Sequence, residues 1–264
     1  MTFAKKSLGQ NFLIDENIIN KISSLIKIED QNILEVGPGT GNLTRALLKK
    51  KPKKFYVIEK DDNLANLLKK EFKDKIIIIN DDILKVNENN LSNEKLIVFG
   101  NLPYNISTEI LCKWIINLND KKIWFRNFIL MFQKEVADRI VANVNSSKYG
   151  RLTILTNWKM TAKKITDIDP ENFYPKPKVK SSLLYFEPKA NFFNFEDSKN
   201  LEKVTDIFFQ NKRKMIKKPL NILFKDASKI IKKINLDEKS RPQNINPLTF
   251  FKISKEYEDE LKLK

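Results

Sequence analysis

Short apolar runs alternate with stretches of helical periodicity through the first half of the chain, and this alternation constrains the fold most. The runs are Asn32–Val36, Phe55–Glu59, Ile76–Ile79, Lys95–Gly100 and Phe128–Phe132. They are nearly continuous, which is typical of strands buried on both faces of a sheet. With helices between them, they predict an α/β fold in which helices cover both sides of a parallel sheet.

The expected helices follow from apolar residues at helical spacing. They lie at 15–27 and then around 42–50, 64–72, 110–115 and 134–144. Segments near 159–168 and 181–187 are expected to be strands that close the sheet.

The character of the sequence changes after Pro188. From Asp197 onward the pattern is helical, and nine Lys or Arg residues but only one Asp lie between Asn211 and Lys233. We therefore predict a large domain at 1–190 and a small, basic, all-α domain at 191–264.

The composition excludes several kinds of chemistry. The 264 residues include no His and a single Cys, Cys112. His-based triads, His metal sites, an internal disulfide and Cys-rich zinc sites are therefore excluded, and we expect no bound metal. The apolar runs are too short to span a bilayer, and the N-terminal MTFAKKSLGQNFL lacks the apolar region of a secretory signal. We expect a cytoplasmic protein.

The charge balance is strongly basic. Lys and Arg number 49 against 33 Asp and Glu, a formal net charge of +16, and only six of the basic residues are Arg. One interpretation is a solvated, lysine-rich surface. The other is an anionic polymer as partner, because neutralisation of phosphates by lysine dominates nucleic-acid affinity. The scarcity of Arg favours recognition of shape and backbone over bidentate reading of guanine.

Three of only six glycines, Gly37, Gly39 and Gly41, stand together in EVGPGTG, between a predicted strand and a predicted helix. Such a turn lets the backbone approach a nucleotide-like ligand. Glu59, at the end of the next strand, is placed to grip a ribose diol. The spacing resembles the S-adenosylmethionine (SAM) loop of Rossmann-like methyltransferases more than a dinucleotide loop. A plain strand–helix turn is the alternative.

Asp82 follows the third predicted strand. There it could accept a hydrogen bond from the adenine amine of SAM, or it could simply cap a turn.

Asn101-Leu102-Pro103-Tyr104 follows the fourth predicted strand, at the edge where open α/β sheets bind ligands. It resembles the motif of enzymes that methylate exocyclic amines of nucleobases. The Asn101 amide oxygen and a carbonyl at Leu102 or Pro103 can each accept one hydrogen of an adenine N6 amine. Pro103 stiffens the turn, and Tyr104 offers a ring for the base to stack on. An ordinary turn with a buried Tyr is the alternative.

A second aromatic residue, Phe173, opens a proline-stiffened segment, FYPKPKV. We predict that Phe173 clamps the other face of a base taken out of its stack. Packing in the core is the alternative.

Motifs along nearly the whole chain resemble the KsgA/RsmA family of ribosomal RNA adenine dimethyltransferases. Besides Glu59 they are GQNFL (9–13), EVGPGTGNLT (35–44), NDDIL (80–84), GNLPYNIST (100–108), FQKEVADRI (132–140), FYPKPKVKS (173–181) and FFQNKRKMI (208–216). The resemblance implies N6,N6-dimethylation of two adjacent adenosines by SAM. These adenosines lie in the hairpin loop near the 3′ end of small-subunit (16S) ribosomal RNA, within an assembling subunit.

The resemblance also implies roles for individual residues. In the cofactor site, Asn11 and Leu13 would line the SAM pocket, Gly37 and Gly39 would cradle the methionine part, Glu59 would bind the ribose, and Asp82 would bind the adenine. Asn101 would contact both SAM and the target amine, and Tyr104 and Phe173 would hold the target base. Asp81 departs from the family, which often has Gly or another small or polar residue there, and it adds a negative charge beside Asp82.

Two other functions stay open. One is an Erm-type methyltransferase acting on 23S ribosomal RNA, and the other is a non-catalytic nucleic-acid-binding relative. FFQNKRKMI and the C-terminal domain favour the first family, and the presence of Asn101, Pro103, Tyr104 and Phe173 favours an active enzyme. Domain 1–190 would bind SAM and catalyse, and domain 191–264 would bind RNA or the ribosome. We expect a monomer.

Overall fold

The structure is a computed structural model that describes residues 4–5, 8–118, 122–210 and 212–262. Asn211, at the start of the predicted basic stretch, and most of the first seven residues lie outside this description. The chain forms two compact units. The first comprises Met1–Ala137 and Ala162–Pro188, and the second comprises Asp138–Thr161 and Lys189–Lys264. Residues 138–161 thus belong to the second unit by their contacts, although the sequence predicts them within domain 1–190. The functions assigned to the two domains stay predictions.

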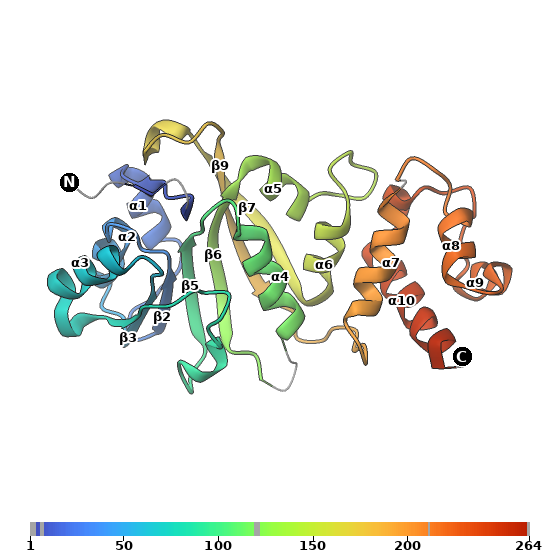
Figure 1. The fold of residues 1–264 in the computed structure, drawn as a ribbon, viewed down its shortest axis with the longest axis horizontal. Helices are drawn as coiled ribbons and strands as arrows, with labels where there is room; N and C mark the ends of the chain where they lie inside the picture. Colours follow the sequence, from blue (N-terminus) through green and yellow to red (C-terminus); the bar gives the residue numbers. More distant parts are fainter. Residues whose placement is uncertain (1–3, 6–7, 119–121, 211, 263–264) are drawn as a thin grey trace. The chain divides into compact units, whose positions relative to one another are not determined.

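A seven-stranded sheet has the strand order β4-β3-β2-β5-β6-β9-β7 (Figure 1). Its strands are β2 (Asn32–Val36), β3 (Lys54–Ile58), β4 (Ile77–Ile79), β5 (Leu96–Asn101), β6 (Phe125–Gln133), β7 (Met160–Ile168) and β9 (Ser181–Pro188). Neighbouring strands from β4 to β6 are parallel, and β9 runs antiparallel to β6. The predicted Rossmann-like α/β sheet is confirmed. A separate two-stranded ribbon pairs β1 (Phe12–Leu13) with β8 (Phe173–Tyr174).

Helices cover both faces of this sheet. They include α1 (Glu16–Ser23), α2 (Asn42–Leu48), α3 (Asp62–Phe72) and α4 (Ser107–Asn117), and a further helix, α5 (Lys134–Ile140), follows β6 directly. Apolar residues of α1, α2 and α3 share one buried cluster with Ile33, Val57 and Phe99 of the strands. Trp114 of α4 packs on Phe128 of β6, with ring centroids 4.8 Å apart. Phe128 and Ile129 are successive residues of β6, so their side chains point to opposite faces of the sheet. Because Ile129 belongs to the first cluster, α4 covers the opposite face.

The second unit contains helices that pack on one another: α6 (Arg151–Lys159), α7 (Lys199–Gln210), α8 (Lys217–Leu223), α9 (Ala227–Ile234) and α10 (Pro247–Lys262). The predicted all-α fold of the small C-terminal domain is confirmed. The sequence pattern did not predict α6, because its β-branched Thr153, Ile154 and Thr156 have low helix propensity. Burial of these three side chains and of Trp158 outweighs that propensity.

Four short 3₁₀ helices complete the described elements: η2 (Lys73–Lys75), η3 (Glu88–Asn90), η4 (Pro170–Asn172) and η5 (Pro242–Asn244). No helix within the described ranges is long and apolar enough to cross a membrane.

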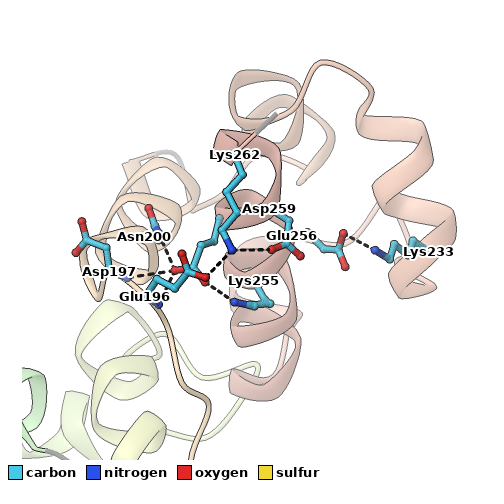
Figure 2. Close-up of polar contacts among 9 residues, drawn as sticks. Glu196, Asp197, Asn200, Lys233, Lys255, Glu256, Asp259 and Lys262 are labelled. Carbon is cyan, nitrogen blue, oxygen red and sulfur yellow. Dashed lines mark hydrogen bonds and ion pairs between the residues drawn. The ribbon is translucent and has the colours of Figure 1, made fainter. Parts of the chain in front are cut away.

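A buried carboxylate, Glu258 of α10, joins α10 to the chain that leads into α7. It accepts hydrogen bonds from the backbone N–H groups of Glu196 and Asp197, at 2.8 and 3.2 Å, and from the Asn200 amide at 3.0 Å. Around it, Figure 2 shows Lys262 directed at Glu196 and Lys233 of α9 directed at Glu256, 2.7 Å away. Polar groups therefore hold three helices of the second unit together.

Candidate active site

The glycine-rich turn lies between β2 and α2, at the carboxyl edge of the parallel strands. Gly37 and Gly39 have φ values of +68° and +59°, in the left-handed region that favours glycine. A Cβ atom on Gly39 would lie 2.5 Å from Cδ1 of Phe12. The two glycines are therefore required by backbone conformation and by the close approach of the N-terminal segment.

A pocket opens at this edge. Of the residues predicted from the sequence, it is lined by Gly37, Gly39, Glu59, Asp82, Asn101 and Pro103. Asn11, Leu13, Leu102, Tyr104 and Phe173 do not line it. The structure thus brings together residues that are up to 66 positions apart in the chain, from the ends of four parallel strands.

Glu59 lies at the end of β3 and is almost fully buried. Its Oε1 accepts a hydrogen bond from Asp61 N at 2.9 Å, and its Oε2 accepts one from Gly39 N at 3.3 Å. Burial raises the pKa of Glu59 above its ordinary value, and the two N–H groups counteract part of that rise. The carboxylate therefore supports the glycine turn from inside the pocket, at the position where a ribose was predicted.

Glu35 lies in β2 behind the turn and is fully buried. Its Oε2 accepts a hydrogen bond from the Thr44 hydroxyl at 2.7 Å. Burial raises the pKa of Glu35 to about 8, and the nearby Glu59 adds to the rise. Near neutral pH this carboxyl is mostly protonated, so it adds little negative charge to the pocket wall.

The loop after β4 forms another wall. Asp82 forms an ion pair with Lys60 at 2.7 Å, and its Oδ1 accepts a hydrogen bond from Leu84 N at 3.0 Å. The hydrogen bond from Lys60 lowers the pKa of Asp82. Asp82 therefore remains ionised near neutral pH and can accept from an amine. Asp81 also lines the pocket, and its Oδ1 accepts from Asp82 N at 2.7 Å.

Lys113 of α4 holds this loop from behind. Its ammonium group donates to the carbonyl oxygens of Ile83 and Val86, at 2.6 and 2.5 Å, and to Oε1 of Glu88 at 2.8 Å. Trp114 Nε1 donates to the same Glu88 oxygen at 2.7 Å. A buried polar network therefore fixes the wall that carries Asp82.

The N-terminal segment lies along the pocket and is tied at both ends. Gln10 Nε2 donates to Asp61 Oδ2 at 3.2 Å, and Asn42 Nδ2 donates to the Leu13 carbonyl at 2.8 Å. Gln10 and Phe12 line the pocket, whereas the Leu13 side chain is buried in the core. The motif GQNFL marks this segment, and its residues alternate in direction. Gln10 and Phe12, which the motif did not single out, therefore line the pocket, whereas Leu13 points into the core.

Asn101 ends β5, and its amide orientation is fixed. Its Nδ2 donates to the carbonyl of Asn11 at 2.7 Å. Asn11 therefore orients the Asn101 amide through its main-chain carbonyl. Oδ1 of Asn101 remains available as an acceptor. The carboxamide can therefore receive an N–H from a bound molecule without reorganising.

The rest of the tetrapeptide packs around that group. Leu102 is buried. It packs so closely on Gly100 that a Cβ atom added to this glycine would lie 2.8 Å from Cδ2 of Leu102. Tyr104 is partly buried, and its hydroxyl shares a short hydrogen bond with the Ser181 hydroxyl at the start of β9. Burial raises the pKa of Tyr104, so its hydroxyl remains protonated at neutral pH.

Phe173 is placed differently from the clamp predicted for it. Only 2 % of its surface is exposed, and it belongs to the apolar cluster that contains Leu13, Ile168 and Leu183. In this arrangement the ring fills the core and offers no free face to a base.

The chain matches known proteins over nearly its full length. Residues 1–259 match the family described as ribosomal RNA adenine dimethylase. The chain is 59 % identical over 256 residues to the ribosomal RNA small subunit methyltransferase A of Pelagibacter ubique, and the match covers 97 % of each chain.

Two solved structures have the same fold. A dimethyladenosine transferase from Plasmodium falciparum is 28 % identical, with a TM-score of 0.79, covering 94 % of this chain and 98 % of that one. The 23S rRNA methyltransferase ErmE has a TM-score of 0.71 over 94 % of this chain and 100 % of that one, but at 21 % identity this likeness concerns the fold alone. From the match over residues 1–259 and the 59 % identity, this chain belongs to the ribosomal RNA adenine dimethylase family.

Proposed function

We propose that this protein transfers methyl groups from SAM to the N6 amines of two adjacent adenosines in small-subunit ribosomal RNA. The adenosines would lie in the 3′-terminal hairpin loop of 16S rRNA within an assembling subunit. The observation that carries the proposal is the Asn101 amide, which is oriented by Asn11 and lines a pocket with Glu59 and Asp82. The name of the Pelagibacter relative favours the small subunit over the 23S substrate of Erm-type enzymes.

The residues of the pocket fit SAM. Gly37 and Gly39 line it without side chains, Glu59 offers carboxylate oxygens for a ribose, and Asp82 offers an ionised acceptor for the adenine amine. SAM, when bound, supplies an electrophilic methyl group on a sulfonium.

The chain's own groups would prepare the adenine amine. The N6 lone pair is delocalised into the ring and is a poor nucleophile. Oδ1 of Asn101 and a carbonyl at Leu102 or Pro103 would each accept one N6–H, which aims the lone pair at the methyl group. Tyr104 would hold the base through its ring. Preorganised acceptors of this kind need no rearrangement during the reaction.

No strong base is needed in this scheme. The methylated ammonium product is acidic and loses its proton to water, which agrees with a chain that contains no His. We therefore expect a pH–rate profile with no essential group titrating near neutrality. We also propose that the protein works as a monomer in the cytoplasm, on subunits during their assembly.

The experiment is transfer of tritiated methyl from SAM to small subunits taken from an unmethylated strain, with nuclease mapping of the label. We expect label on two adjacent adenosines near the 3′ end. In single turnover, Asn101→Ala should lose on the order of 10²-fold in rate while still binding subunits. Asn66→Ala, on the exposed surface of α3, serves as the matched control. Label only in 23S rRNA, or a near-normal rate for Asn101→Ala, would overturn the proposal.

A further inference from the structure

The ribbon of β1 and β8 decides which aromatic side chains face the pocket. Its register pairs Phe12 with Tyr174 and Leu13 with Phe173. Directly opposite residues of an antiparallel pair lie on the same face, and successive residues lie on opposite faces. Leu13 and Phe173 both belong to the core cluster, so Phe12 and Tyr174 share the other face of the ribbon.

That other face borders the pocket through Phe12, and Tyr174 is not among the residues that line the pocket. Phe12 lines the pocket, and its ring occupies the space beside Gly39. Its cross-strand neighbour Tyr174 is 65 % exposed, against 2 % for Phe173. The accessible aromatic ring on the pocket side of the ribbon is therefore that of Tyr174.

The segment that Tyr174 opens connects the ribbon to the Asn101–Tyr104 motif. It ends at Ser181, whose hydroxyl is hydrogen-bonded to Tyr104. Between these ends, Lys176 pairs with Glu171, and Lys180 pairs with Asp169 at 2.7 Å. Lys178 is exposed and forms no ion pair within the part of the chain that the structure describes. One lysine of this segment is thus available for a phosphate.

We propose that Tyr174 stacks on an unpaired base of the RNA loop at the pocket, while Lys178 contacts a phosphate beside it. This inference rests on the proposed function, and it gives Tyr174 the stacking surface that the sequence predicted for Phe173. An exposed ring suits a loop nucleotide because every base has a π-face and unpaired RNA bases can be splayed out.

The test compares Tyr174→Ala, Tyr174→Phe and Val179→Ala in the full-length protein. Val179 lies in the same segment and is 45 % exposed, so it controls for loss of exposed apolar surface without a ring. Methyl transfer to unmethylated small subunits is measured at limiting subunit concentration. SAM affinity by calorimetry and thermal unfolding are measured on the same samples.

We expect kcat/KM to fall about tenfold or more in Tyr174→Ala, the loss of one base–aromatic stack. Tyr174→Phe should restore the rate, while SAM affinity and the unfolding temperature stay unchanged in all three variants. A fourth variant, Lys178→Met, tests the phosphate contact. It should reduce the slope of log K against log salt for subunit binding by about 0.7. If Tyr174→Ala matches Val179→Ala, the inference is wrong although the proposed function stands. If wild-type protein transfers no label to small subunits, it is the proposed function that fails.

Discussion

Glu59 is a buried side chain and also the predicted ligand of the ribose. It is 7 % exposed and holds two backbone N–H groups, so a bound ribose would add hydrogen bonds to a carboxylate that is already in place. Removing a hydrogen bond to a charged group costs roughly 1.5–3 kcal/mol. Glu59→Ala should therefore weaken SAM binding at least about tenfold, as measured by calorimetry.

Two comparisons make this test specific. Glu59→Gln keeps the shape and one acceptor, so its affinity should fall between those of the wild type and Glu59→Ala. Far-UV circular dichroism shows whether each variant is folded. Unchanged SAM affinity in folded Glu59→Ala would contradict the ribose role.

Among the helices, α10 depends on one buried carboxylate. Burial tends to raise the pKa of Glu258, but Lys255, two backbone N–H groups and Asn200 outweigh it, and the pKa is lowered. Because the folded-state pKa lies below the unfolded value, the stabilisation is present above the ordinary pKa of a glutamate. It is lost as pH falls through the lowered, folded-state pKa.

Glu258→Gln should therefore lower the free energy of unfolding by roughly 1–3 kcal/mol at pH 7. The difference from wild type should shrink as pH falls below about 4.5, the range in which the wild-type carboxylate takes up its proton. Urea unfolding at several pH values measures both effects. Asp259→Asn is the control, because this exposed side chain lies 3.9 Å from Lys262 and should matter little. A pH-independent difference would contradict the ionic role of Glu258.

For the molecule as a whole, the question is whether the net charge of +16 serves a partner or only solvation. Lys212, Arg213 and Lys214 are exposed, and they lie in a turn between α7 and α8 rather than in the helix that the sequence suggested. Residues 212–215 are all exposed, and the next buried residue is Ile216. No apolar side chain in this stretch would therefore hold one face of a helix against the core.

Reversing Lys212, Arg213 and Lys214 to Glu should weaken subunit binding and flatten its salt dependence. Each lost phosphate contact should remove about 0.7–0.9 from the slope of log K against log salt. Reversing Lys69, Lys70 and Lys73, exposed residues at the end of α3 and just after it, changes the total charge equally. SAM affinity should stay constant in both variants. Equal binding losses in the two would mean that the charge run near α8 is only a solvated surface.

Much of the fold follows from local sequence patterns. Continuous apolar runs predicted β2, β3, β5 and β6, because a strand buried on both faces needs such a run wherever its neighbours lie. The edge strand β4 was also predicted from its apolar run, although Ile77 in it is exposed. The run at 76–79 became β4 at Ile77–Ile79, and the helix expected at 15–27 ends at Ser23. Gly37 and Gly39 could be predicted because only glycine adopts a left-handed backbone without strain.

What the sequence by itself determined about this protein is the parallel sheet, the glycine turn, and the placement of Glu59, Asp82 and Asn101 at strand ends. Only the tertiary structure decided that Phe173 is buried while Tyr174 is exposed, and that 151–159 is a helix. The physical reason is how far apart in the chain the residues lie that determine each feature. A turn or a buried strand is specified by its own residues, whereas the face that a residue such as Phe173 presents depends on the register with β1, 160 positions away in the chain.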